Sequence, residues 1–597
     1  MPQAQINQDP LSSPSVQLSE KESITRLLNA YLRESGQFEP SDVSFFHPEI
    51  TKVIWLPHTK LGIYGTVLHL SAGGHHVFGE HFYTKDAQQW KKNSFAEVIQ
   101  LVLDEICFAQ ADSSSKSQKR AELEALIHNS QQRLNHYLAF AAEQEREQGE
   151  RLLDFRYLEQ ALLCGHPFHP TPKSLQGFSD SDSQAYSPEF GAAFTLHCFA
   201  AAAEYIAEDW LGEQSNEEHF AWIPPAMKAA AEAKLGAASG DYRLLPCHPW
   251  QAEYVRSLAP VQKLLEQGLL VDLGDTGPLV YPTSSVRTVW NPEQACFYKL
   301  SLHIRITNFI RENTPEQLLR TLDASRAIDA IRKEYTTESF KLLLEEGYRT
   351  LRIPEAGQSL NEELMSAFSM IVREAPEECT SAEEPPFVIA SLLEVPPGHS
   401  EPLLFRAVRQ ALYPKLPDWT NWLRQYLHLS MKPLLHLYAE TGISLEAHVQ
   451  NAMLRLHQGM PGTFYVRDLE GISINMEIAE QRGWINTLLR EDSPVLYSEE
   501  QARHRLKYYF FVNHLSHLIA RISYYSGQEE QVYWAIASDM LQEIKQTSSH
   551  ALLHNLIQDL LTSATLPAKA NLLSRFHQRG ETPLYVEIPN PMRRDES

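Results

Sequence analysis

The stretch that decides the fold is PTSSVRTVWNPEQACFYKLSLHIRITNFIR, residues 282–311. Residues 286–290 alternate β-branched, aromatic and polar side chains, which predicts a strand. Asn291-Pro292 then breaks the chain, and residues 296–306 alternate again. Alternate residues of a strand point to the same face. A strand over 296–306 would therefore place four polar side chains on one face: Lys299, Ser301, His303 and Arg305.

The same stretch groups cations with hydroxyls. Ser284, Ser285, Arg287 and Thr288 come just before or at the first predicted strand, and Lys299 lies on the second. Arginine offers a rigid fork of donors and lysine a mobile point charge, so the pair suits a phosphate or a carboxylate. A solvated sheet face that carries surface cations explains these residues equally well.

Length and charge narrow the class of protein. A chain of 597 residues exceeds one typical domain, so we expect two to four packed units. The 52 lysines and arginines against 75 acids leave a net charge of -23, which argues against a general nucleic-acid binder. The six cysteines are scattered without a CxxC pair, which is typical of reduced thiols in a cytoplasmic protein.

The ends and the most apolar stretch predict no membrane anchor. Residues 1–18 lack the basic-then-apolar pattern of a signal peptide, and we interpret them as a disordered lead. The capping-box pattern from Ser19 to Glu22 predicts that the first helix begins there. We expect the longest apolar helix at residues 190–207, but His197 and Glu204 interrupt it, so it does not predict a membrane span.

Two His-Pro segments stand out as candidate functional loops. GHPFHPTPKSLQGFS, residues 165–179, is too rich in proline for a helix and presents His166, His169 and Lys173 on a rigid turn. LLPCHPWQ, residues 244–251, ends a short predicted strand at His248. Two such turns suggest a shared pocket. A proline-stiffened structural connection is the alternative, and a zinc site is a weak one because no cysteine or HExxH accompanies the histidines.

A third candidate lies in SLEAHVQNAMLRLHQGMPGTFYVRDLEG, residues 444–471. Its apolar spacing predicts a helix with His448 and Asn451 on one flank and Glu446 in the first turn. A strand over residues 463–467 then leads to Asp468. A carboxylate at a strand end suits a hard cation such as Mg²⁺. Asp468 could equally cap a turn.

The rest of the chain narrows the chemistry by what it lacks. We expect residues 313–402 to be mostly helical and without chemistry, and the part after residue 498 to be helical core. The sequence has no GxxxxGK[ST], no GxGxxG after a strand, no GxSxG and no HExxH. P-loop, Rossmann, hydrolase-elbow and zincin sites are therefore not predicted.

Taken together, the motifs GHPFHPTPK, LPCHPWQ, SSVRT, KLSLHIRITNFIR, EAHVQN and VRDLEG resemble those of the siderophore synthetases that work without nonribosomal peptide synthetases, the IucA/IucC family. The resemblance implies an α+β fold shaped like a cupped hand, with mixed helices and antiparallel sheets. It implies a thumb-like region over residues 19–150, a fingers-like ATP-binding region over 151–400 and a mainly helical palm over 401–597. It further implies a cytoplasmic homodimer that uses ATP and Mg²⁺.

The resemblance also implies roles for individual residues. The nucleotide would be held by Ser285, Arg287, Thr288, Lys299, Arg311, His448, Asn451 and Asp468. The acid and the nucleophile would meet His166, His169, Lys173, Arg311 and Lys569. Catalytic roles would fall to His169, Arg287, Lys299, Arg311 and His448, and the metal to Asp468 and Glu446. Leu175 stands where the family usually has an arginine, which leaves an anion contact to be supplied elsewhere.

The implied activity is that of an adenylating ligase. Such enzymes activate a carboxylate of citrate or a related acid with ATP, release pyrophosphate, and let an amine or hydroxyl attack the acyl-adenylate. The ordinary pKa of histidine would suit His169 or His448 as the base that accepts the proton of the nucleophile. The sequence leaves the nucleophile, the exact acid and the siderophore product open. A non-enzymatic protein that binds citrate or ferric citrate is the alternative.

Overall fold

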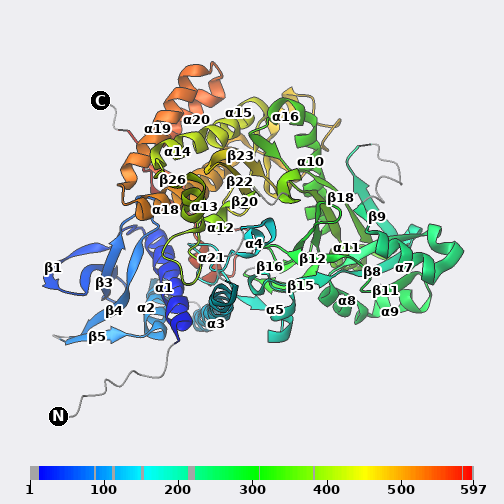
Figure 1. Ribbon diagram of the computed structural model, residues 1–597, viewed down its shortest axis with the longest axis horizontal. Helices are drawn as coiled ribbons and strands as arrows, with labels where there is room; N and C mark the ends of the chain where they lie inside the picture. Colours follow the sequence, from blue (N-terminus) through cyan, green and yellow to red (C-terminus); the bar gives the residue numbers. More distant parts are fainter. Residues whose placement is uncertain are drawn as a thin grey trace, which may run out of the picture.

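The computed structural model describes residues 13–86, 89–109, 115–148, 153–212, 222–307, 309–380, 384–580 and 582–594. An N-terminal sheet with its helices, a central block of small sheets, and a mostly helical C-terminal part follow one another along the chain (Figure 1). Helices and antiparallel sheets are mixed throughout, which confirms the predicted fold class.

The N-terminal part is a five-stranded antiparallel sheet covered by helices. Its strands pair in chain order: β1 (Ser41–His47), β2 (Ile50–Leu56), β3 (Leu61–His69), β4 (Val77–Asp86) and β5 (Gln89–Asn93). Its helices are α1 (Pro14–Ser35), α2 (Phe95–Ala109) and α3 (Lys116–Gln148). Leu28 of α1 and Val98 of α2 are fully buried in this core. Leu572 and Phe576, from far along the chain, complete it.

The first helix begins earlier than the sequence predicts. Ser13 is its N-cap, with a side chain that accepts the Val16 N–H, and Pro14 opens the helix. Ser19 lies inside the helix, where its hydroxyl donates to the Val16 carbonyl at 2.8 Å. The expected start at residue 19 is therefore wrong, and of the expected disordered lead, residues 1–12 lie outside the described residues.

The central block is built on a seven-stranded sheet. In spatial order its strands are β7 (Phe194–Thr195), β12 (Leu279–Pro282), β13 (Thr288–Asn291), β14 (Cys296–Leu300), β19 (Met370–Glu374), β18 (Glu345–Leu351) and β9 (Ile206–Trp210). Two three-stranded sheets adjoin it: β10 (Tyr242–Cys247), β8 (His197–Ala202) and β11 (Leu270–Gly274), and β16 (Phe309–Arg311), β15 (Leu302–Ile306) and β6 (Leu175–Gln176). The helices around them are α4 (Phe155–Gln160), α5 (Asp180–Tyr186), α7 (Pro225–Leu235), α8 (Pro249–Arg256), α9 (Ala259–Glu266), α10 (Pro315–Tyr335), α11 (Gln358–Phe368) and α12 (Ile389–Leu392).

The two strands expected from the deciding stretch form, but the first begins two residues later, at Thr288, and the second is divided. The second run divides at Ser301 into β14 and β15, which belong to different sheets. Ser301 leaves the ladder because its N–H donates to the Ser369 carbonyl at 3.0 Å and its hydroxyl donates to the Ser366 carbonyl. The alternation predicts that Lys299 shares a strand with His303 and Arg305. This prediction is wrong, because Lys299 lies on β14 and the other two lie on β15.

Residues 190–207 are not a helix, contrary to expectation. They form the short strand β7 and the strand β8, which pairs with β10 on one side and β11 on the other. Every residue of His197–Ala202 except the last is buried. A strand enclosed on both faces reads as a continuous apolar run, which the sequence pattern cannot distinguish from a buried helix.

Residues 313–402 are also less helical than expected. Between α10 and α11 the chain forms β17 (Phe340–Leu342) and β18, and after α11 it forms β19 and β20 (Phe387–Val388). β17 pairs in parallel with the distant β23 (Met460–Val466), and β18 and β19 extend the central sheet. This segment joins the central block to the C-terminal part.

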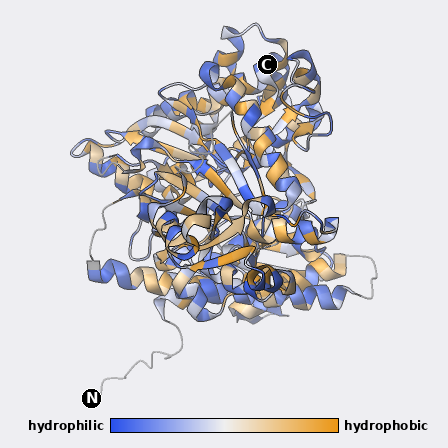
Figure 2. Ribbon diagram, turned by 90° about the vertical axis from the view of Figure 1, so that its right-hand side faces the viewer, coloured by the Kyte–Doolittle hydropathy of each residue, from blue (hydrophilic) through white to orange (hydrophobic). Residues whose placement is uncertain are grey.

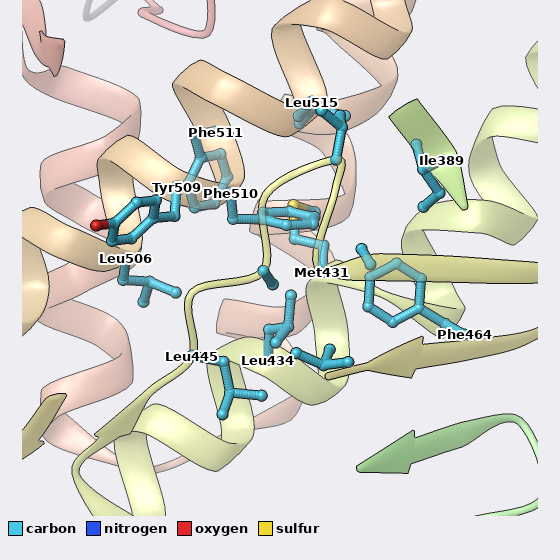
Figure 3. Close-up of a cluster of buried hydrophobic side chains, with 14 of the residues drawn as sticks. Ile389, Met431, Leu434, Leu445, Phe464, Leu506, Tyr509, Phe510, Phe511 and Leu515 are labelled. Atoms are coloured by element: carbon cyan, nitrogen blue, oxygen red, sulfur yellow. The ribbon is translucent and has the colours of Figure 1, made fainter. Parts of the chain in front are cut away.

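The C-terminal part is mainly helical, as predicted. Its helices are α13 (Leu403–Leu412), α14 (Trp419–Leu429), α15 (Met431–Thr441), α16 (Met476–Gln481), α17 (Glu499–Leu506), a π-helix (Lys507–Leu515), α18 (Ser516–Ser526), α19 (Glu530–Thr547), α20 (Ala551–Thr562) and α21 (Asn571–Phe576). Its strands are β21 (Ile443–Ser444), β22 (Ala452–His457), β23, β24 (Ser473–Asn475), β25 (Leu496–Tyr497), β26 (Thr565–Lys569) and β27 (Tyr585–Pro589). Figure 3 shows Phe510, Phe511 and Leu515 of the π-helix beside Met431 and Phe464 in the largest core.

The helices carry both hydrophilic and hydrophobic residues along their length (Figure 2). This pattern is expected of helices that cover a core with one face and meet water with the other. None of the described helices combines the length and the apolar character that crossing a bilayer requires.

Candidate active site

Three cations lie on neighbouring strands of the central sheet. Arg287 directly precedes β13, Lys299 lies on β14, and Arg373 lies on β19. Thr288 pairs with Lys299 across β13 and β14, and Phe297 pairs with Arg373 across β14 and β19. Lys299 is only 3% exposed and Arg287 only 7%. A buried cation needs an acidic partner or a ligand, because burial alone strongly disfavours charge.

Carboxylates from the C-terminal part and from β18 face these cations. The Lys299 ammonium lies 2.8 Å from Asp468 Oδ1 and 2.7 Å from Glu470 Oε2. Arg373 lies 2.7 Å from Glu345 Oε1 and 3.4 Å from Asp468 Oδ1. Asp468 reaches the sheet from the end of β23, in a left-handed conformation with φ 64°. The sites predicted for phosphate and for metal are thus in direct contact.

The electrostatics of this cluster favour the charged forms of Asp468 and Lys299. Burial opposes the charge on Asp468, but Lys299 and Arg373 together hold the pKa of its carboxyl well below the ordinary range. Burial likewise opposes the charge on Lys299, and Asp468 and Glu470 raise its pKa. Glu345, which is fully buried, has a raised pKa because desolvation outweighs the attraction of Arg373.

The turn before β13 presents hydroxyls and backbone donors beside Arg287. Ser285 Oγ accepts the Thr288 N–H at 3.1 Å, and Ser284 Oγ accepts an N–H of the Gln450 side chain at 3.0 Å. Val286 has φ 68°, a conformation that is rare for a β-branched residue. A turn held in such a conformation is frequent at ligand sites.

Arg287 and Arg311 form a second layer of the site. Arg287 donates to Asn313 Oδ1 at 2.7 Å and to the Glu312 carbonyl at 3.0 Å. Arg311, on β16, donates to the Ile306 carbonyl and to Thr307 Oγ1 at 3.3 Å each. Burial and the neighbouring Arg287 lower the pKa of Arg311 to about 10. These two guanidinium groups repel each other, so an anion placed at both would be stabilised.

Four histidines share one hydrogen-bond arrangement, of which His169 and His248 are buried and His166 and His448 partly buried. In each, Nδ1 accepts the backbone N–H two residues further along the chain: from Phe168 for His166, from Thr171 for His169, from Trp250 for His248 and from Gln450 for His448. An acceptor Nδ1 fixes the neutral tautomer with the proton on Nε2. The arrangement therefore turns an Nε2–H donor away from each loop.

This tautomer argues against the role of base that the sequence suggests for His169 and His448. Burial, and then the charges of Arg575 and Arg311, lower the pKa of His169 to about 3. Burial lowers the pKa of His448 as well. Both rings therefore stay neutral at pH 7, with the one lone pair on Nδ1 already used. Their chemistry is donation of a hydrogen bond to an oxygen of the substrate.

His166 contacts a side chain that can match this tautomer. Its Nε2 lies 2.9 Å from the side-chain nitrogen of Asn513, on the π-helix, and the Asn513 oxygen has no partner among the described residues. Exchanging the amide oxygen and nitrogen lets Asn513 accept from His166 Nε2–H, and such exchanges are a routine assignment choice. His166 then holds the loop to the π-helix.

Residues 444–456 are not the predicted helix. After β21 the chain makes irregular turns through His448 and then enters β22, which forms a hairpin with β23. Within the turns, His448 N–H donates to the Glu446 carbonyl at 2.9 Å and the Asn451 side chain donates to the same carbonyl at 3.3 Å. The predicted proximity of His448 and Asn451 is retained, but a turn produces it.

Glu446 and Lys569 form a separate corner of the site. Glu446 packs against Gly471 so closely that a Cβ on the glycine would lie 1.4 Å from its Oε2. Lys569, at the end of β26, donates to Tyr509 Oη at 3.1 Å. Burial lowers the pKa of Lys569, and Glu446 opposes this effect. Lys569 is thus a partly buried amine whose charged form Glu446 favours.

Lys173 and His248 lie apart from this group. The Lys173 ammonium is buried in an ion pair with Glu189 at 2.6 Å and donates to the Leu162 carbonyl, which favours a structural role for it in the loop. The ring of His248 packs among Phe194, Tyr186 and Phe178. The shared pocket expected for the two His-Pro turns is not formed by these side chains.

The site offers few carboxylate oxygens as ligands for a metal ion. Within the described ranges, no three residues of the His, Cys, Asp or Glu type are grouped closely enough to hold a metal ion alone. Burial lowers the pKa of His448, and both Glu446 and Asp468 oppose this effect, so the two carboxylates act on the same ring. This donor set fits Mg²⁺, which takes one or two carboxylates together with the phosphates of a substrate.

Comparison with known proteins identifies the family of this chain. Residues 154–394 match the family model described as "IucA / IucC family", and residues 420–584 match "Ferric iron reductase FhuF-like transporter". The chain is 34% identical over 579 residues to the L-2,3-diaminopropanoate--citrate ligase of Staphylococcus aureus (strain NCTC 8325 / PS 47), covering 96% of this chain and 95% of that protein. The chain belongs to the IucA/IucC family.

Two further relatives extend the comparison. The spermidine-citrate ligase of Bacillus anthracis is 27% identical, and the match covers 97% of this chain and 98% of that protein. The solved structure of ATP-bound aerobactin synthetase IucA from Klebsiella pneumoniae has a TM-score of 0.84 at 23% identity, covering 96% of this chain and 100% of that one. The chain therefore shares its fold with that structure.

The site of this family member joins both matched regions. The first region supplies His169, Arg287 and Lys299, and the second supplies His448, Asp468 and Lys569. Leu175, at the position of the expected family arginine, is 5% exposed and packs with Val286 and Leu302. It contributes to the core under the turn and makes no anion contact.

The sequence analysis missed three charged members of the site. Arg373, Glu345 and Glu470 complete the ion-pair cluster, and two of them lie in the segment that we expected to be helical and without chemistry. A short apolar run, residues 370–372 ahead of Arg373, is the signal that could have revealed β19. The pairing of Arg373 with Glu345 follows from the long-range strand register.

Proposed function

We propose that this chain is an ATP-dependent ligase that activates a carboxylate of citrate or a related acid and joins it to an amine. In the first step a carboxylate oxygen attacks the α-phosphorus of ATP, forming an acyl-adenylate and releasing pyrophosphate. In the second step the amine nitrogen attacks the acyl carbon, AMP leaves with the bonding electron pair, and one proton is lost from nitrogen. The product is an amide.

The observation that carries the proposal is the buried cluster of Arg287, Lys299 and Arg373 against Asp468 and Glu470. A triphosphate offers Lys299 the same negative oxygens as its present partners do. Lys299 would therefore keep an anionic partner when the triphosphate binds. Preorganised cations of this kind stabilise the charge that grows on leaving pyrophosphate.

The neutral part of the site suits the acid. His169 Nε2–H can donate to a carboxylate oxygen, and Arg311 supplies the nearby positive charge. Asp468, with Glu446, would hold Mg²⁺, which neutralises charge on the phosphates when bound. The named relatives act on citrate with an amine, which supports the same pairing of substrates here.

A coupled assay tests the proposal. The protein is incubated with citrate, ATP, Mg²⁺ and hydroxylamine, and pyrophosphate and hydroxamate are measured together. We expect both products to appear and to depend on citrate. If a panel of di- and tricarboxylic acids gives no acid-dependent pyrophosphate, the proposal is wrong and a binding protein becomes the better explanation. At present the curated relatives do not favour that alternative.

We also propose that the protein acts as a homodimer, as the resemblance implies. Light scattering on the purified full-length chain checks this directly. A mass of about twice 68.1 kDa is expected.

A further inference from the structure

A second cationic cavity lies beside the proposed acid site. It is an open cavity with a volume of about 750 Å³, lined by α3, by the small sheet of β6 and β15, and by the chain around α21. Among its described lining residues are the arginines Arg305, Arg575 and Arg579, and the acid Glu122. The cavity is distinct from the Lys299 cluster, whose residues do not line it.

The arginines of this cavity repel one another electrostatically. Burial, and then the positive charge of Arg305, lower the pKa of Arg575. The Arg575 Nε is buried and has no hydrogen-bond partner among the residues described. Glu122 accepts from the side-chain amides of Gln118 and Gln578, and its charge only partly opposes the lowered pKa of Arg575. Guanidinium groups arranged in this way are complementary to an anion, which they can bind in a bidentate manner.

The cavity is connected to the acid site through the backbone. Arg305 on β15 and Arg311 on β16 belong to one antiparallel pair, in which Arg305 is opposite Ile310. Asn571, at the start of α21, donates to the Phe168 carbonyl at 3.2 Å and so ties α21 to the His-Pro loop. His169 lies in the fields of both Arg575 and Arg311. A molecule bound in the cavity is therefore a neighbour of the carboxylate that His169 and Arg311 would hold.

We propose that this cavity binds the carboxylate of the amine substrate, so that the nucleophile is an amino acid and not a simple polyamine. The inference rests on the proposed function and names its second substrate. The nucleotide and the acid have their own cations in Arg287, Lys299 and Arg311. The ammonium group of a polyamine would be repelled here, whereas the carboxylate of an amino acid would be attracted while its amine remains free to reach the acyl carbon.

Matched pairs of amines test this inference. Each pair has the same amine spacing and differs only in the carboxylate: 2,3-diaminopropanoate against 1,2-diaminoethane, ornithine against putrescine, and lysine against cadaverine. With citrate, ATP and Mg²⁺, amide formation is followed by mass spectrometry and kcat/KM is determined for each amine. We expect the wild-type enzyme to prefer the amino acid in the best pair by at least about 10-fold, because a charge-assisted hydrogen bond is lost without the carboxylate.

Variants then assign the preference to the cavity. Arg575→Gln should lower kcat/KM for the amino acid by about 10- to 100-fold, and by at least about 10-fold more than for its decarboxylated partner or for hydroxylamine. Arg575→Lys should restore part of the loss, since it returns the charge without the fork. Arg490→Gln, at an exposed arginine paired with Asp492, is the matched control and should change neither amine. Arg305→Gln provides the same comparison if Arg575→Gln does not fold.

The outcomes separate this inference from the one on which it rests. Absence of hydroxamate from the wild-type enzyme overturns the proposed function and this inference together. Hydroxamate formation with equal kcat/KM within every amine pair overturns this inference alone. A variant that raises the KM for citrate while the amine preference persists assigns the cavity to the acid and also overturns it.

Discussion

The two halves of the site bury polar groups by opposite means. The ion-pair half is made of Lys299, Arg373, Asp468, Glu345 and Glu470, with Arg287 beside them, and it holds its charged groups by pairing acids with cations. The histidine half, made of His166, His169 and His448, keeps its rings neutral by burial and by backbone hydrogen bonds to Nδ1. One half exchanges partners when an anion binds. The other presents donors whose state does not change near neutral pH.

This difference separates two demands of adenylation. Leaving pyrophosphate develops a large charge that only fixed cations can stabilise, and a cation can be kept buried before substrate binds only if acids hold it. A carboxylate that must act as a nucleophile should be oriented without being fully neutralised. A neutral Nε2–H donor meets that demand better than a second cation would.

Removing Lys299 should have the largest effect, because it removes two ion pairs, one with Asp468 and one with Glu470. Lys299→Ala leaves Asp468 and Glu470, which are partly buried, without their shared cation, so we expect the free energy of unfolding to fall by about 2–3 kcal/mol. Citrate-dependent pyrophosphate release should fall by about 100-fold or more. Thermal melts and pyrophosphate assays measure the two effects.

The matched control removes a lysine from a surface pair. Lys91 lies 2.6 Å from Glu97, but its side chain is 63% exposed, so Lys91→Ala should cost less than about 1 kcal/mol. A folded Lys299→Ala protein with wild-type pyrophosphate release would remove Lys299 from the phosphate site.

Asp468→Asn should come next, because it keeps the shape of the ion-pair half and removes one charge. The amide oxygen is a poorer metal ligand than a carboxylate, so activity should fall by about 10- to 100-fold and be partly restored by higher Mg²⁺ or by Mn²⁺. The KM for citrate should change little. Steady-state rates measured against metal concentration check this, and an unchanged metal dependence would return Asp468 to the role of ion-pair partner only.

The ion-pair half was partly predictable from sequence, because two of its strands have a local pattern of alternating residues. The alternation around Arg287 and Lys299 produced β13 and β14 as expected. The acidic partners were not predictable, because Glu345 reaches Arg373 only through the register of β18 against β19. Local patterns place a residue on a strand, but they do not reveal which distant strand pairs with it.

The histidine half was predicted in its residues and not in its chemistry. The proline-rich loop and the proximity of His448 to Asn451 were expected, but the helix predicted around His448 is a set of turns. Buried turns carry apolar residues on several sides, and over about a dozen residues this mimics helical spacing. The neutral tautomer depends on the hydrogen bond from the residue two positions on, which only the folded loop defines.

His169 should show a smaller and more selective effect than the charged residues. His169→Ala removes one neutral donor, so we expect the KM for citrate to rise by about 10-fold and the KM for ATP to change little. His169→Gln, which keeps an N–H donor, should recover part of the loss. Because burial lowers the pKa of His169 to about 3, neither variant should remove a pH-rate transition near pH 6.5. Loss of such a transition would mean that His169 acts as a base after all.

The smallest effect should come from His248, which shares the arrangement of the histidine half and lies outside the site. Burial lowers its pKa to about 3, whereas an unfolded histidine titrates near 6.5. Between these values the unfolded chain binds a proton that the folded chain does not. The contribution of His248 to the free energy of unfolding is therefore complete above about pH 6.5, and it falls by about 1.4 kcal/mol for each pH unit below that value.

His248→Asn keeps a side-chain cap for the Trp250 N–H and removes this titration. The variant should melt below wild type at pH 7, since it loses ring contacts, and the difference in Tm should narrow as the pH falls to 5. His550→Asn, at an exposed histidine, should leave the profile as it is. A difference in Tm that is constant from pH 7 to pH 5 would show that His248 titrates alike in both states, and the neutral tautomer assigned to the whole histidine half would then lose its support.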